Sequence, residues 1–249
     1  MSYLQTSPEN QIVLDKAKEW FKEKIVANHI KNTQALRNPK EFDINTFLAT
    51  YLSAFLTGKV SKDGIARTLV YARSLSTSIT TSFGLNMQNF ISDVLQSSYG
   101  SVVAGIDIEF EDKIDGRKKY AQLKLGPNTI NKDDVTTIDN HFKAIRGLAK
   151  QNQRQINLTD LIVGVLYGEE ADLSAHYKKL RDDYNYPVFV GNDFWHRLSG
   201  DDMFFSKLIH SISEISNEVN SSDIVEQVIK DLSSTEAIKK LAELASSKS

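Results

Sequence analysis

The sequence predicts an α/β fold: a central mixed β-sheet flanked by helices, with a mainly helical N-terminal region. Two changes in the apolar pattern carry this prediction. Apolar and polar residues alternate over 106–125, as in strands with one buried face, whereas apolar positions over 11–96 recur at helical steps of three and four. A short, wholly apolar run follows at 161–167, which is typical of a strand buried on both faces.

The helical region is expected to open with an amphipathic helix at Gln11–Ile30. The same three- and four-residue spacing predicts further helices at Ile44–Leu56, Gly64–Ser76 and Leu85–Gln96. No internal repeat and no Gly/Ser-rich linker interrupts the chain. We therefore expect one domain over residues 1–249.

The alternating stretch predicts a β-hairpin around the turn pair Asp115-Gly116. A two-residue turn at this point fixes a register in which all the apolar residues share one face. The expected pairs are Ile106 with Leu125, Ile108 with Leu123 and Phe110 with Ala121 on the apolar face, and Asp107 with Lys124 and Glu109 with Gln122 on the polar face.

After the hairpin, Asn131 is expected to cap a crossover helix that has two aspartates in its first turn. That helix leads to the apolar strand at 161–167, so the sheet contains a parallel pair. The remaining expected elements are a helix at Leu173–Asp183, a strand at Val188–Val190, a helix from about Asp193 and a C-terminal helix at Val225–Leu244.

Composition excludes several classes of protein. The chain has 249 residues, of which 41% are hydrophobic and 25% charged, as in an ordinary globular protein. It has no cysteine, which excludes disulfides and thiolate metal sites. The net charge of −2 is not the global signature of a nucleic-acid binder, although basic residues cluster within 113–124. No run approaches the roughly 20 apolar residues of a membrane span, so we expect a cytoplasmic protein.

One constellation in the hairpin can carry chemistry. Asp107 lies on the first strand, and Gln122 and Lys124 lie two residues apart on the second. A carboxylate and a lysine at one edge of a sheet suit metal-assisted phosphodiester hydrolysis, in which Mg²⁺ stabilises the charge on the scissile phosphate. By spacing alone, a solvent-facing Asp–Lys pair explains the same residues.

The longer stretch GIDIEFEDKIDGRKKYAQLKLGPNTINKDDV resembles the active-site region of type II restriction endonucleases of the PD-(D/E)XK superfamily. The resemblance continues through LIVGVLYGEE and PVFVGNDFWHRLSG and so covers roughly residues 84–200. It is closest to enzymes that cut interrupted or degenerate GG…CC palindromes. It implies a single endonuclease domain with a helical region at 1–100, a catalytic core at 101–200 and C-terminal helices at 201–249.

The resemblance assigns roles residue by residue. Asp107 takes the place of the metal-binding aspartate and Lys124 that of the catalytic lysine. Gln122 stands where the family usually has Glu or Asp, and its amide oxygen ligates a metal without adding charge. Because the expected register sets Glu109 opposite Gln122, Glu109 is our candidate for the second acidic ligand, with an exposed strand carboxylate as the alternative. The corresponding place on the preceding helix offers Gln88, and Asp93 follows it.

The segment GPNTIN follows the catalytic strand and is expected, on the resemblance, to face DNA. Its polar side chains Asn128, Thr129 and Asn131, with Lys132, suit contacts to base edges and phosphates. A turn followed by a helix cap explains the same residues. The five histidines show no metal-ligand spacing, so we assign none of them to the site.

The resemblance implies a Mg²⁺-dependent, sequence-specific double-strand DNA endonuclease of a restriction–modification system, with a cognate DNA methyltransferase acting on the same short palindrome. The alternatives are a repair or junction nuclease of the same superfamily and a DNA-binding module without turnover. A palindrome presents two equivalent strands, so we expect a homodimer. Its interface is expected on the apolar stripe of 47–55 or on that of 229–241.

Overall fold

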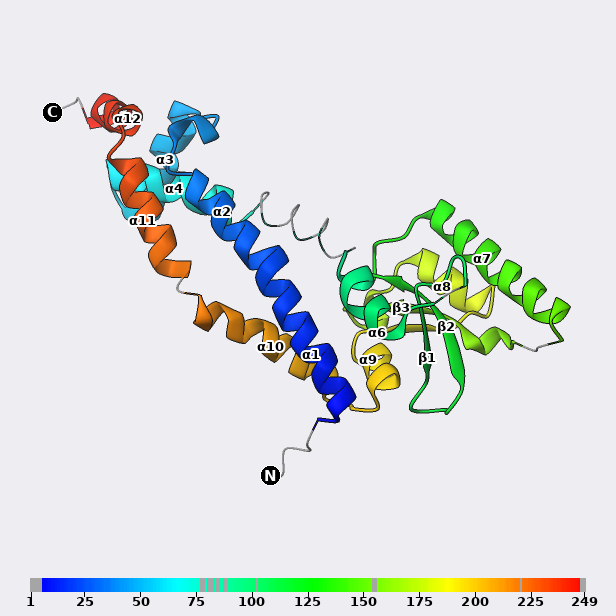
Figure 1. Ribbon diagram of the computed structural model, residues 1–249. Helices are drawn as coiled ribbons and strands as arrows, with labels where there is room; N and C mark the ends of the chain where they lie inside the picture. The colour runs from blue at the N-terminus through cyan, green and yellow to red at the C-terminus, as the bar shows by residue number, and fades with distance from the viewer. Residues whose placement is uncertain are drawn as a thin grey trace. The chain divides into compact units, whose positions relative to one another are not determined.

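The computed structural model describes residues 6–76, 79, 83, 86, 89–101, 103–153, 156–219 and 221–246 (Figure 1). The chain divides into two compact units. Unit 1 comprises residues 1–20 and 87–212, and unit 2 comprises residues 21–86 and 213–249. The sequence-based regions 1–100 and 201–249 therefore both contribute to unit 2, while the assignment of all residues to one endonuclease domain stays a prediction.

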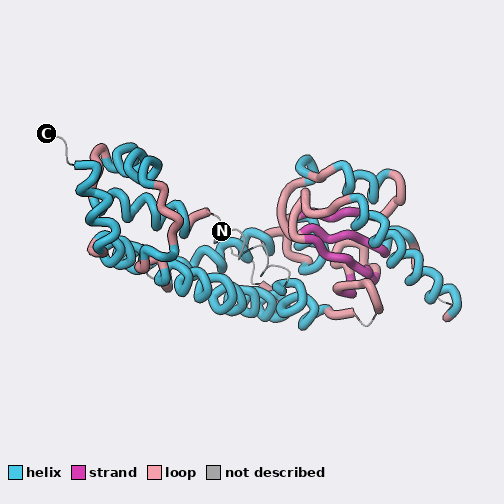
Figure 2. The backbone as a smooth tube through the Cα atoms, turned by 90° about the horizontal axis from the view of Figure 1, so that it is seen from above, coloured by secondary structure: helices cyan, strands magenta, loops and turns pink. Residues whose placement is uncertain are grey.

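Unit 1 contains a β-sheet, drawn in magenta in Figure 2. Its four strands have the order β1-β2-β3-β4. The strands are β1 (Ile108–Glu111), β2 (Lys118–Lys124), β3 (Leu161–Val165) and β4 (Val188–Val190). The hairpin pair β1/β2 is antiparallel, and β2/β3 and β3/β4 are parallel. The predicted mixed sheet is confirmed, including the parallel strand reached through the crossover helix.

The predicted hairpin exists, but its register is wrong by two residues. Ile108 lies opposite Ala121, and Glu109 lies opposite Tyr120 instead of Gln122. A shift of two keeps every strand residue on its predicted face, because side chains alternate with a period of two.

The hairpin turn explains the shift. The Asp112 N–H donates to the Arg117 carbonyl at 2.9 Å, so these two residues close the loop instead of the residues next to Asp115-Gly116. Gly116 adopts a φ of +68° and donates its N–H back to the Asp112 carbonyl at 2.8 Å. The glycine therefore ends a four-residue loop and does not form half of a two-residue turn.

Two helices cover one face of the sheet, α7 (Lys132–Gln151) and α8 (Ala175–Asp182) (Figure 1). The inward side of α7 carries Ile138 and Phe142, which pack in one cluster with Val163 of β3. Asn131 caps α7 as predicted: its side chain accepts the N–H groups of Asp133 and Asp134. The period-3.6 pattern of 131–148 therefore predicted both the start of the helix and its buried face.

The opposite face of the sheet is covered by α9 (Asn192–Ser199). Phe194 and Trp195 of α9 are buried, and the Phe194 ring packs edge-to-face on Phe110 of β1. Gly164 of β3 lies directly under the Phe194 ring, where a Cβ would stand 2.5 Å from the ring. The absence of a side chain at Gly164 is what lets α9 approach the sheet closely.

The rest of unit 1 consists of helical elements. They are α1 (Pro8–Trp20), η3 (Ile91–Gln96), α6 (Ser97–Tyr99), the short η4 (Leu158–Asp160) and η5 (Glu170–Asp172), and the first part of α10 (Phe204–Glu218). The helix predicted at 85–96 is described only in its later part, since residues 85, 87 and 88 lie outside the described residues.

Unit 2 is helical in its described residues. Its elements are η1 (Phe21–Val26), α2 (Ala27–Ala35), η2 (Pro39–Glu41), α3 (Thr46–Thr57), α4 (Lys62–Ser74), α11 (Ser221–Ser233) and α12 (Glu236–Ser246). The core joins Ile65 and Val70 of α4 to Ile229 and Leu232 of α11. The single helix expected at 225–244 is two helices. None of the described helices has the length and apolar character that a membrane span requires.

Candidate active site

The predicted site lies at the carboxyl end of β2, where loops after three parallel strands meet. Gly126 follows β2, and a Cβ there would lie 2.6 Å from the Tyr167 ring of the loop after β3. In the same way, Gly168 packs on Pro127. The carboxyl edge of parallel strands is where α/β proteins commonly bind ligands.

Asp107 lies in a bend just before β1 and is held on β2. Its N–H donates to the Ala121 carbonyl at 3.0 Å, and its Oδ2 accepts the Leu123 N–H at 2.6 Å. Burial raises the pKa of the Asp107 carboxyl, while the Leu123 N–H and the Lys124 ammonium act to lower it. The aspartate is thus fixed next to the two candidate residues of β2.

Gln122 is buried under α7, with 7% of its surface exposed. Its Nε2 donates to the Gly105 carbonyl at 2.5 Å and lies 2.6 Å from Nδ1 of His141, which α7 contributes. That no histidine belongs to the site stays a prediction, but one histidine does lie beside a candidate site residue. His141 contacts Gln122 directly.

Lys124 is the last residue of β2, and its side chain is 27% exposed. Its Nζ lies 3.6 Å from Oδ1 of Asp134, in the first turn of α7. The other carboxylate oxygen of Asp134 accepts the Asn131 N–H at 2.9 Å. One side chain thus links the helix cap to the candidate catalytic lysine.

Glu109 does not lie opposite Gln122. Its carboxylate accepts the Ser101 hydroxyl at 2.6 Å and forms an ion pair with Lys118 at 2.5 Å. Its role as a metal ligand stays a prediction, which these two contacts do not favour. The sequence also offers two positions on the preceding helix. Asp93 accepts the indole N–H of Trp20 at 2.9 Å, and Gln88 lies outside the described residues.

A comparison against protein families identifies the family of the chain. The family model described as Type II restriction endonuclease EcoO109I matches residues 15–220 of the 249. The chain belongs to this restriction endonuclease family. No curated protein matches the chain. The match begins in α1 and ends beyond α10, so it includes elements of both units of the endonuclease.

The predicted DNA-facing segment of the endonuclease lies at the same edge of the sheet. Asn128 and Lys132 are exposed. The Thr129 hydroxyl donates to the Gly126 carbonyl at 2.8 Å, and Oδ1 of Asn131 accepts two N–H groups of the helix cap. Bidentate pairing with adenine uses both the oxygen and the nitrogen of an asparagine amide, and the cap already uses the oxygen of Asn131. DNA contact by these residues stays a prediction, and the helix cap makes base pairing of this kind less suited to Asn131 than to Asn128.

The basic cluster near the hairpin is largely used by ion pairs within the endonuclease. Lys119 is buried, and its Nζ lies 2.6 Å from Oδ2 of Asp115. Arg117 forms two hydrogen bonds with Asp160, at 2.8 and 2.6 Å. These contacts use the charges of Arg117 and Lys119 within the protein, which leaves these two residues less suited to binding phosphate.

The donor atoms at the site are hard oxygens and one imidazole. Among the described residues no group of three His, Asp or Glu side chains is arranged to hold a metal ion. Mg²⁺ commonly binds through one or two carboxylates and keeps several waters, so Asp107 with the Gln122 amide oxygen fits a magnesium ion. A soft metal has no thiolate ligand here.

Sequence reasoning missed Asp134 and His141 of the endonuclease. Both lie on α7, seven residues apart, and so share one face of the helix. His141 is adjacent to the inward residues Ile138 and Phe142, and this position was the available signal. Metal-ligand spacing in the sequence does not show which face of a helix a histidine occupies.

Proposed function

We propose that this endonuclease is a Mg²⁺-dependent enzyme that cuts both strands of DNA at a short palindrome, as part of a restriction–modification system. The observation that carries the proposal is the convergence of Asp107, Gln122 and Lys124 at the carboxyl end of β2. The family match supports the nuclease class. The metal, the palindrome and a cognate methyltransferase that protects the same site are our proposals.

In this proposal each residue has a defined task. Asp107 and the Gln122 amide oxygen hold Mg²⁺, which when bound stabilises negative charge on the scissile phosphate. Lys124 orients the attacking water, and Asp134 at 3.6 Å orients the Lys124 ammonium. Asn128 and Lys132 contact the DNA beside the cleavage position.

The test is cleavage of plasmid DNA with Mg²⁺ and without it, by the parent and by Asp107→Ala and Lys124→Ala. We expect discrete fragments with the parent and Mg²⁺, and no cleavage with either variant, because both lose positioning of the reacting groups. Lys143→Ala is the matched control, since Lys143 is an exposed α7 lysine paired with Asp139. Near-normal cleavage by either site variant would remove the active-site assignment.

The same assay separates the alternatives. Structure-selective cutting indicates a repair or junction nuclease, and DNA binding without cutting indicates a binding module. The module is favoured by one observation, the neutral amide of Gln122 where a carboxylate is usual. Cleavage by Glu109→Gln at limiting Mg²⁺ tests the second acidic ligand: a rate equal to that of the parent excludes Glu109.

The homodimer belongs to the same proposal, and the exposure of the two apolar stripes favours one of them. The C-terminal stripe is buried in the core of unit 2, where Ile229, Leu232 and Ile238 are at most 1% exposed. The stripe on α3 is open: Phe47 is 90% and Phe55 76% exposed. Exposed aromatic patches of this kind commonly mark protein interfaces.

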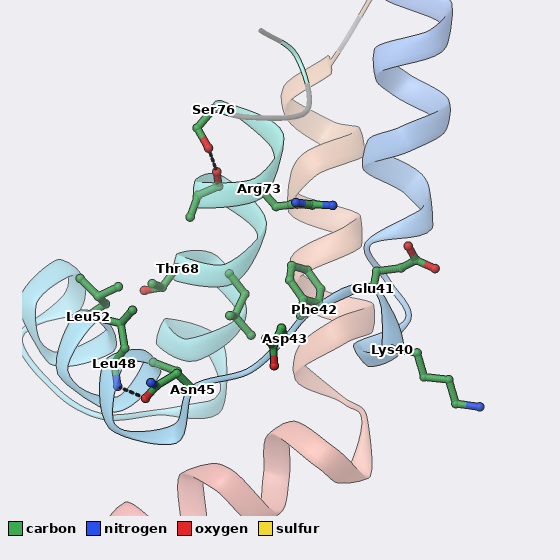
Figure 3. Close-up of a pocket in the computed structure, with 13 residues that line it drawn as sticks. Lys40, Glu41, Phe42, Asp43, Asn45, Leu48, Leu52, Thr68, Arg73 and Ser76 are labelled. Atoms are coloured by element: carbon green, nitrogen blue, oxygen red, sulfur yellow. Dashed lines mark hydrogen bonds between the residues drawn. The ribbon is translucent and has the colours of Figure 1, made fainter. Parts of the chain in front are cut away.

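A pocket of about 690 Å³ adjoins the α3 stripe within unit 2 (Figure 3). Leu48 and Leu52 of α3 line it together with residues of α4, and Leu48 is also part of the exposed stripe. Thr68 lines the same pocket, and its buried hydroxyl has no hydrogen-bond partner within the described structure. We place the second copy of the chain on this face.

Sedimentation of the Phe47→Asp/Phe55→Asp variant tests the interface. We expect the parent to have about twice the 28.0 kDa of one chain and the variant to be a monomer. Leu75→Asp replaces another exposed apolar residue of unit 2 and serves as control. A monomeric parent at micromolar concentration, both free and on its specific duplex, would exclude the dimer.

A further inference from the structure

We infer that His141 is a positioning residue that holds the amide of Gln122 with its oxygen toward the metal site. This rests on the proposed function, because it concerns the same site. It also explains why a glutamine at position 122 is compatible with a metal-dependent nuclease. The glutamine belongs to a hydrogen-bonded set formed by Gly105, Gln122 and His141.

The Gly105 carbonyl distinguishes the nitrogen of the Gln122 amide from its oxygen. A carbonyl oxygen only accepts hydrogen bonds, so the Gln122 atom 2.5 Å away from it must be the amide nitrogen. The same nitrogen lies 2.6 Å from Nδ1 of His141. Both N–H groups of the amide are then used, and the oxygen Oε1 is the polar atom left to bind a ligand.

This arrangement also fixes the tautomer of the histidine. Since Gln122 donates to Nδ1, that ring nitrogen must be unprotonated, and the neutral imidazole carries its proton on Nε2. His141 therefore acts as an acceptor that orients a metal ligand, a role that second-layer partners commonly play around metal sites.

Gly105 is required for this contact in two ways. Its φ of +82° lies in the region that favours glycine. A Cβ at this position would lie 2.6 Å from Cγ of His141, which no side chain tolerates without moving the ring. The backbone thus brings a carbonyl to Gln122 and leaves space for the imidazole.

A glutamate at position 122 does not fit the same set. One of its oxygens would replace the amide nitrogen next to the Gly105 carbonyl, so two acceptors would face each other where a hydrogen bond now exists. The Gln122→Glu change restores the usual motif of the family, yet we expect it to bind Mn²⁺ no more tightly than the parent.

The decisive variants are His141→Asn and His141→Leu. The asparagine oxygen stands near the place of Nδ1 and accepts from Gln122, whereas leucine fills similar space without an acceptor. Measured by electron paramagnetic resonance with Mn²⁺ on an uncleavable duplex, His141→Leu should weaken metal binding about 10- to 100-fold, and His141→Asn should retain most of it. A merely structural role predicts that leucine does as well as asparagine.

A second measurement needs neither metal nor DNA. In ¹⁵N-histidine-labelled protein, the ring of His141 should show an unprotonated Nδ1, and Gln122→Leu should shift that resonance while leaving the His176 resonances unchanged. A protonated Nδ1 in the parent, or no shift on changing Gln122, would overturn the inference. If the parent binds no Mn²⁺ and cuts no DNA, the proposed function fails, and the spectra still test the Gln122–His141 pair.

Discussion

Removal of Arg197 from its buried ion pair with Asp112 is expected to destabilise unit 1 strongly. Asp112 closes the hairpin loop and is fully buried, with an exposed fraction of 0%. Nη1 of Arg197 lies 2.9 Å from Oδ2 of Asp112, and the Ile114 N–H donates to the other oxygen at 2.9 Å. The guanidinium also lies over the Phe189 ring, 4.0 Å from its centroid.

Arg197→Met separates the charge from the packing, because methionine still covers Phe189. It leaves the Asp112 carboxylate buried without its counter-charge, which costs about 3–5 kcal/mol in comparable pairs. Asp193, the second partner of Arg197, is 54% exposed, so Asp193→Asn should cost less than about 1 kcal/mol. The two partners of one arginine thus serve as test and control.

Urea unfolding followed by tryptophan fluorescence measures the effect on unit 1 alone. Both tryptophans of the chain, Trp20 and Trp195, belong to that unit. With a slope of about 2 kcal/mol/M, the expected loss lowers the urea midpoint by about 2 M. The double variant Asp112→Asn/Arg197→Met should recover part of the loss, because it removes the unpaired charge.

A small effect of Arg197→Met would refute this reasoning. If its midpoint lies within about 0.5 M of that of Asp193→Asn, an unpaired buried carboxylate is not present in the variant. The same conclusion follows if Asp112→Asn/Arg197→Met is as unstable as Arg197→Met, since the cost then comes from lost packing.

Three further changes have defined outcomes. Gly164→Ala places a Cβ 2.5 Å from the Phe194 ring and should lower the stability of unit 1 by about 1–3 kcal/mol in urea unfolding; an unchanged midpoint contradicts the close packing. Arg67 lowers the pKa of the Glu226 carboxyl in the folded protein. The pair therefore stabilises unit 2 at pH values above the ordinary carboxylate pKa, and this stabilisation is lost as the pH falls through the lowered pKa of Glu226. Acid titration followed by circular dichroism should show a weaker pH dependence for Glu226→Gln than for the parent. Removal of divalent ions with EDTA should abolish DNA cleavage and Mg²⁺ should restore it, and cleavage that persists in EDTA excludes the magnesium proposal.

Local signals in the sequence predicted most of the α/β fold. Asn131 followed by two acidic residues predicted the start of α7, because the capping interactions involve only neighbouring residues. The apolar run 161–165 predicted β3, because a strand buried on both faces has little room for polar residues.

The register of the hairpin was not predictable from alternation alone. Registers that differ by two residues place the same side chains on the same face, and the turn decides between them. Asp115-Gly116 matches a two-residue turn in sequence, but the contact from Asp112 to Arg197 of α9 involves a residue far along the chain. That contact favours the loop closed by Asp112. It cannot be predicted from the residues next to the turn.

The candidate site likewise contains residues that local patterns predicted and residues that they did not. Asp107, Gln122 and Lys124 follow from strand periodicity and the family resemblance, because they lie on adjoining strands. His141 and Asp134 reach the site only because α7 crosses back over β2. The helix pattern gives the inward face of α7 but not the residue of β2 above which each turn lies, so their partners required the three-dimensional structure.

The division of both units into separate segments has a consequence for synthesis. The core of unit 2 joins α4 to α11, and residues 87–212 of unit 1 are made between them. At about 5–20 residues per second, the ribosome needs roughly ten seconds to make that intervening segment. During this interval the apolar face of α4, with Ile65 and Val70, has no α11 to cover it. The core of unit 2 can therefore be completed only after α11 has been made, that is, after residue 233.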